Sequence, residues 1–99
     1  MKTDLIDEVG IDQKGRLYVR PRDCTFPFIY REGMEVNWDA DNGHLYGPPP
    51  RTWDYIRWYR QIILAASNQG VVLNHHPETT WSSVPEALRN EIINFDHNA

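Results

Sequence analysis

Apolar and polar residues alternate along much of the first half of the chain, and this is the period of a half-buried β-strand. Residues 9–11 and 16–20 are two such segments, and only four residues separate them. The last of the four is Gly15, which suits the left-handed position that closes a hairpin loop. The pattern therefore predicts a first β-hairpin.

The alternation resumes over residues 26–38, where a turn at Glu32-Gly33 separates two predicted strands. Asn42-Gly43 follows, which is a strong short-range hairpin signal because both residues tolerate a positive φ. It leads into a further strand at residues 44–46. Together with the first hairpin, these segments predict an antiparallel β-meander over residues 9–46.

The firmest feature of the sequence is a long helix that begins near Thr52. Three prolines at positions 48–50 predict an extended connector before it, because proline donates no backbone hydrogen bond. Thr52 is a good N-cap, Asp54 suits the first turn, and Gly70 is placed to end the helix, so we predict a helix over residues 53–69. At ~100° per residue, one half of its circumference is apolar and should pack on the sheet. That half holds Tyr55, Ile56, Trp58, Tyr59, Ile62, Ile63, Ala65 and Ala66.

Trp53 and Leu64 fall on the other half of this helix, which should face water. With Arg57 and Arg60 they form a stripe at spacings i, i+4, i+7 and i+11. Trp and Arg often dominate protein interfaces, and an Arg can stack on a Trp one turn away. We predict that this stripe binds a partner. The alternative is that a C-terminal helix covers Trp53 and Leu64.

The end of the chain predicts a short strand at residues 71–73 and a second helix at residues 84–95. Ser83 and Glu86 have the spacing of a capping box, which marks a helix N-terminus. An apolar stripe on the second helix indicates that it packs on the rest of the fold. We therefore predict an α+β fold with an antiparallel β-meander packed against one long helix, a second C-terminal helix and a single domain over residues 1–99.

Composition narrows the function. The net charge of −4 argues against nucleic acid as a partner, since binding phosphates requires an excess of Lys and Arg. Cys24 is the one cysteine of the chain, and no apolar segment approaches the ~20 residues of a membrane span, so we expect a cytoplasmic protein without a membrane partner. No phosphate-binding or dinucleotide-binding fingerprint is present, and we predict no cofactor.

One local motif suggests enzymatic chemistry. The segment Asn74-His75-His76-Pro77-Glu78, followed by Trp81, resembles the active-site motif of pterin-4a-carbinolamine dehydratases. That resemblance implies proton transfer by His75 and His76. The chain departs from the family because a glycine and a predicted strand precede the motif and a capped helix follows it. Neighbouring side chains on an extended segment point in opposite directions, so we predict no metal site at these histidines.

A second resemblance covers residues 11–70. Residues 15–21 (GRLYVRP), 30–39 and 50–59 (PRTWDYIRWY) resemble small bacterial proteins encoded by integron gene cassettes, and they are also similar to immunity-type proteins that neutralise toxins. This resemblance implies a compact cytoplasmic α+β protein that binds a partner, in some members as a homodimer. It implies no active-site residues.

We therefore expect a non-catalytic interaction protein that uses the aromatic and Arg stripe, with a protein partner or self-association. A small ligand is a second class of partner. The alternatives are a small enzyme of the pterin-carbinolamine dehydratase type that uses His75 and His76, and a homodimer whose role is structural.

Overall fold

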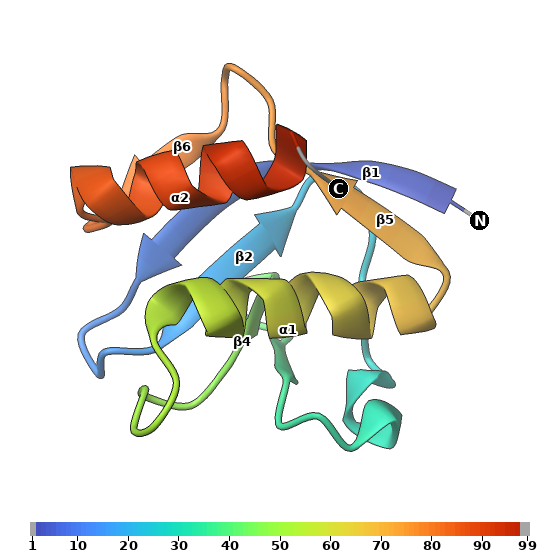
Figure 1. The fold of residues 1–99 in the computed structure, drawn as a ribbon. Helices are drawn as coiled ribbons and strands as arrows, with labels where there is room; N and C mark the ends of the chain where they lie inside the picture. The colour runs from blue at the N-terminus through green and yellow to red at the C-terminus, as the bar shows by residue number, and fades with distance from the viewer. Residues whose placement is uncertain (1, 98–99) are drawn as a thin grey trace.

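The computed structural model of the chain describes residues 2–97, which form a six-stranded mixed sheet with both long helices on one side of it (Figure 1). The sheet has the order β3-β4-β2-β1-β5, and β6 also pairs with β1. This confirms the predicted α+β fold with a long helix packed against the sheet. In chain order the elements are β1 (Lys2–Ile11), β2 (Leu17–Pro21), the 3₁₀ helix η1 (Ile29–Glu32), β3 (Asn37–Asp39), β4 (His44–Tyr46), α1 (Tyr55–Asn68), β5 (Val71–Asn74), β6 (Thr80–Ser82) and α2 (Glu86–His97).

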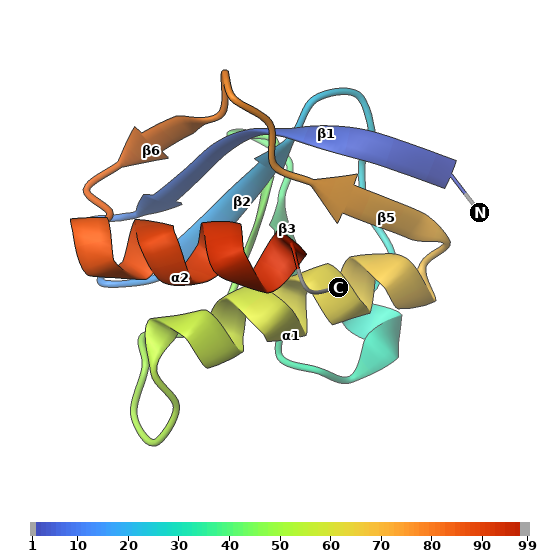
Figure 2. The same cartoon turned by 45° about the horizontal axis from the view of Figure 1, so that its top comes forward.

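The strands β3, β4, β2 and β1 are joined by antiparallel pairs, as the meander predicts. The other edge of β1 differs, because β5 and β6 both run parallel to it. The first part of β1 pairs with β5 and its last part with β6, so one long strand carries two short neighbours in line (Figure 2). Thr79 bridges them, since its hydroxyl donates to the Ile6 carbonyl at 2.7 Å.

The strand β1 is longer than the predicted residues 9–11. Its register against β2 shifts between Ile6 and Glu8, which is a β-bulge. Ile6 and Val9 are consequently both buried although they are three residues apart, so the alternation that marks a strand is lost from the sequence. Asp4 is buried as well, and its carboxylate accepts hydrogen bonds from the backbone N–H groups of Asp23 and Cys24.

The prediction of two strands over residues 26–38 is largely wrong. Phe26 is buried, but the chain then turns into η1, which leaves Phe28 and Tyr30 exposed. The alternation of aromatic residues there comes from a tight helical turn. Beyond the turn at Gly33, the positive φ of Glu35 (60°) delays the start of β3 until Asn37.

The helix α1 starts two residues later than predicted, because Asp54 and not Thr52 is its N-cap. The Asp54 carboxylate accepts from the Arg57 backbone N–H at 3.1 Å. Gly70 follows the helix with a φ of 88°, as its predicted role at the helix end requires. The buried residues of α1 all belong to the predicted apolar arc: Trp58, Tyr59, Ile62, Ala65 and Ala66.

The helix α2 lies beside α1 on the same side of the sheet (Figure 2). Its Leu88 and Ile92 are buried in the common core, and Phe95 meets Tyr59 edge to face at 6.0 Å. α2 leaves Leu64 uncovered, since 52% of that side chain's surface is exposed. Among the described residues, no helix is long and apolar enough to cross a membrane.

Candidate binding surface on the outer side of α1

The four residues of the predicted stripe line one shallow groove on the outer side of α1. Trp53, Arg57, Arg60 and Leu64 contribute successive turns, and Phe95 closes the groove from α2. Its volume is about 510 Å³. We call it the α1 groove. The described residues that line it are Trp53, Arg57, Arg60, Gln61, Ile63, Leu64, Ser67 and Phe95.

Both arginines of the α1 groove lie over aromatic rings. The Arg57 Cζ atom is 5.4 Å from the centroid of the Trp53 ring, and the Arg60 Cζ atom is 5.2 Å from that of Phe95. Neither guanidinium forms an ion pair with a side chain of residues 2–95. None of the described side chains that line the groove is acidic, and together they offer positive charge, aromatic surface and the exposed Leu64.

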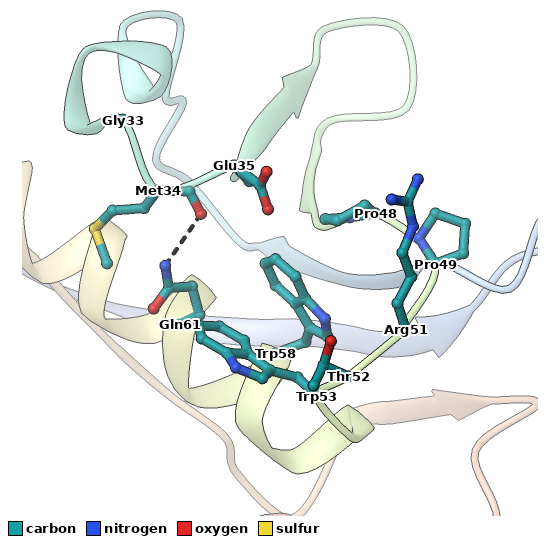
Figure 3. A pocket seen from close by; sticks show the side chains of 10 residues that line it. All are labelled: Gly33, Met34, Glu35, Pro48, Pro49, Arg51, Thr52, Trp53, Trp58 and Gln61. Carbon is teal, nitrogen blue, oxygen red and sulfur yellow. Dashed lines mark hydrogen bonds between the residues drawn. The ribbon is translucent and has the colours of Figure 1, made fainter.

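A second hollow, of about 500 Å³, opens at the N-terminal end of α1 (Figure 3). Trp53 and Gln61 line both hollows, so the two share a wall. Gln61 also fixes the loop above it by donating from Nε2 to the Met34 carbonyl at 3.1 Å. We call this the Trp58 hollow; it is lined by Gly33, Met34, Glu35, Pro48, Pro49, Arg51, Thr52, Trp53, Trp58 and Gln61.

Sequence reasoning missed the Trp58 hollow. Its walls come from the loop before β3, the proline connector and α1, which are far apart in the sequence. The sequence placed Trp58 in the apolar arc of the helix, which assigned it wholly to the core. Trp58 is indeed buried, yet it reaches the floor of the hollow.

The sheet surface opposite the helices, which we call the open face, carries a connected polar cluster centred on Glu8. The Glu8 carboxylate accepts from the Tyr18 hydroxyl at 2.8 Å, from Ser82 Oγ and from Arg20. Burial raises the pKa of Glu8, but the hydrogen bonds from Ser82 and Tyr18 and the charge of Arg20 outweigh it, so the net pKa is lowered. The Tyr18 side chain covers Gly10, its partner across the strands, and a Cβ added there would lie 2.6 Å from the ring carbon Cε2.

His44 is buried in the same open face. Its ring stacks on Tyr18 with centroids 4.4 Å apart, and its Nε2 atom is 4.0 Å from the Asp39 carboxylate. Its Nδ1 atom has no hydrogen-bond partner among the described residues. Burial lowers the pKa of His44, and this outweighs the opposing attraction of Asp39. The surroundings of His44 therefore favour its neutral form.

His75 and His76 lie in the turn between β5 and β6, and neither lines the α1 groove or the Trp58 hollow. The His76 backbone N–H donates to Thr79 Oγ1, and its ring nitrogen Nδ1 accepts from the Glu78 backbone N–H at 3.3 Å. These bonds give His76 a part in holding the turn. Among the side chains of residues 2–95, no group of His, Cys, Asp and Glu is arranged to hold a metal ion.

The fold and these surfaces define a small α+β protein with two open hollows that share one helix. The family model described as Integron Cassette Protein Hfx_Cass5 matches residues 4–78. A solved structure of Integron Cassette Protein Hfx_Cass5, from the mobile metagenome of North West Arm Sewage Outfall, is 43% identical, with 98% of each chain covered and a TM-score of 0.51. The chain belongs to the Hfx_Cass5 family of integron cassette proteins. No curated protein matches it.

Proposed function

We propose that the protein is a non-catalytic binding protein that holds a partner protein in the α1 groove. The observation that carries this proposal is the pair of guanidiniums, Arg57 and Arg60, that form no ion pair with a described residue and lie beside the exposed Leu64. Arg and Trp are the side chains that most often supply binding energy at interfaces. Arg57 and Arg60 are held over rings, so less side-chain entropy is lost when a partner binds.

The chemistry of the α1 groove indicates a partner with an acidic surface and an apolar side chain to cover Leu64. The whole chain has a net charge of −4, so the positive charge of the groove is local and would set the orientation of the partner. A symmetric dimer through the groove would bring the arginines of both copies together, with no carboxylate among the described lining side chains to separate them. A different protein is therefore favoured over a second copy, consistent with an immunity-like role in the bacterial cytoplasm.

The test compares arginines that have the same local setting. Arg89 of α2 lies 5.4 Å from the centroid of the Trp81 ring, the separation found for Arg57 and Trp53, but outside the groove. A partner identified by co-purification from the native host is titrated with Arg57→Ala, Arg60→Ala and Arg89→Ala proteins by calorimetry. We expect Kd to rise at least about tenfold for the first two variants, a loss of ~1.4 kcal/mol, and to stay unchanged for Arg89→Ala. Equal affinity in all three variants contradicts the proposal.

A further inference from the structure

The Trp58 hollow has a rigid aromatic floor. The Trp53 and Trp58 rings are 4.9 Å apart between centroids and inclined at 50°. Trp58 is fixed from behind by Gly47, where an added Cβ would lie 2.8 Å from the ring carbon Cε3. Figure 3 shows both indoles below the opening of the hollow. A floor already held by the fold needs little rearrangement to receive a ligand.

Two opposite charges stand on different walls of the hollow. Glu35 comes from the loop before β3 and points toward Trp58, whereas Arg51 extends along the proline connector (Figure 3). They form no ion pair with each other or with another described residue. The fold thus presents a carboxylate and a guanidinium above one aromatic surface with neither charge neutralised by a neighbour.

The backbone at Glu35 is an independent sign that its side chain is used. Its φ of 60° lies in the left-handed region, which is unfavourable for a residue with a Cβ and easily adopted by glycine. Glu35 is exposed, so its side chain fills no space in the core. Packing of the core therefore does not explain the strained backbone of Glu35. Backbone strain of this kind is concentrated at binding and active sites, and Glu35 lies on the wall of a hollow.

We propose that the Trp58 hollow binds a small zwitterion, an α-amino acid or its N-methylated form. Its ammonium group would lie between Glu35 and the tryptophan floor, since cations are attracted to the face of an indole. Its carboxylate would bind the planar fork of Arg51. The apolar body of the ligand would cover Trp53 and Pro48. The volume of about 500 Å³ falls in the range of ligand pockets, roughly 300–1,000 Å³.

The first experiment is a thermal-shift screen of the protein against the common amino acids and glycine betaine. The strongest stabiliser is then compared by calorimetry with two counterparts, the same molecule without its carboxylate and the same molecule without its ammonium group. We expect at least one zwitterion to bind, and each counterpart to bind at least about tenfold more weakly. Absence of binding by every probe at about 10 mM overturns the proposal.

Substitutions of Glu35 and Arg51 test which charged group of the ligand each of these side chains binds. Glu35→Gln should weaken binding of the zwitterion, so that its affinity is no longer higher than that of the counterpart that lacks ammonium. In Arg51→Gln, the affinity of the zwitterion should no longer be higher than that of the counterpart that lacks carboxylate. Glu86→Gln, at an exposed position on α2, is the matched control and should bind as the parent protein does. Zwitterion binding that is unchanged in both Glu35→Gln and Arg51→Gln overturns the proposal.

Two further variants keep the result interpretable. Glu35→Gly should relieve the backbone strain and raise the melting temperature while abolishing binding. A loss of binding in this more stable variant comes from the missing carboxylate and not from unfolding. Leu64→Ser changes only the α1 groove and should leave zwitterion binding intact. Zwitterion binding that falls in Leu64→Ser but persists in Glu35→Gly would assign the ligand to the groove and overturn the proposal.

Discussion

The open face of the sheet and the outer side of α1 both carry aromatic and charged side chains, but they use them differently. On the open face the charges are matched within the molecule, since Glu8 accepts hydrogen bonds from Tyr18, Arg20 and Ser82. On the outer side of α1 the guanidiniums of Arg57 and Arg60 meet rings and no described carboxylate. Composition alone does not separate the two surfaces.

The difference shows that the pairing of polar groups, more than their presence, distinguishes a structural surface from one available for binding. A partner at the open face would have to break hydrogen bonds that Glu8 already makes, and each would cost free energy to replace. A partner at the α1 groove would add charge-assisted contacts to Arg57 and Arg60, which form no ion pair with a described side chain. We therefore expect changes on the open face to reduce stability and changes on the outer side of α1 to reduce binding.

Of the changes on these two surfaces, the largest effect is expected from Glu8→Ala. The substitution leaves the donors of Tyr18 and Ser82 without their acceptor and Arg20 without its counter-ion. Hydrogen bonds to a charged group contribute about 1.5–3 kcal/mol, so the free energy of unfolding should fall by about 2–3 kcal/mol in urea denaturation. Glu91→Ala, at an exposed position on α2, is the control. Equal stability of the two variants would show that the Glu8 cluster does not hold the sheet.

Gly10→Ala should be the next most damaging change. The new Cβ would overlap the Tyr18 ring, which covers Gly10, and would push it away from His44 and Glu8. Overpacking of this kind costs about 1–3 kcal/mol, measurable by thermal or urea unfolding. The control is the same substitution in a Tyr18→Ala background, where the cost should disappear. If Gly10→Ala still reduces stability in the Tyr18→Ala background, the loss comes from the backbone of β1 and not from the Tyr18 ring.

Acid should weaken the open face through His44. Burial lowers its pKa in the folded state below the unfolded value of about 6.5, so the unfolded chain binds more protons below that pH. The contribution of neutral His44 is complete above pH ~6.5 and declines as the pH falls below it. His44→Phe keeps a ring against Tyr18 and should flatten the fall in unfolding free energy between about pH 7 and 5. Parallel curves for the variant and the parent protein would contradict this account.

The helical part of the fold could be predicted because its signals are local. The apolar arc of α1, the end of that helix at Gly70 and the second helix all follow from spacing within one segment. The stripe from Trp53 to Leu64 was predicted in the same way, and the structure brings its four residues to one groove. The N-cap was misplaced because Thr52 and Asp54 are both good caps, and only the backbone geometry distinguishes them.

The rest of the fold depends on contacts between distant segments. The bulge in β1 removes the alternation before Val9, and the parallel pairing of β5 and β6 with β1 leaves no local pattern. Glu35 and Arg51 are both ordinary exposed residues in the sequence. Only the folded chain puts them around Trp58, so the second hollow could not have been predicted from spacing.

The smallest effect on stability is expected on the outer side of α1. Leu64→Ala removes a side chain that is 52% exposed, so the free energy of unfolding should change by less than about 0.5 kcal/mol. The same substitution at Leu88, a residue of α2 whose side chain is buried in the core, should cost about 2–5 kcal/mol and is the matched control. A loss above about 1 kcal/mol for Leu64→Ala would show that this side of α1 supports the fold, and the contrast with the open face would fail.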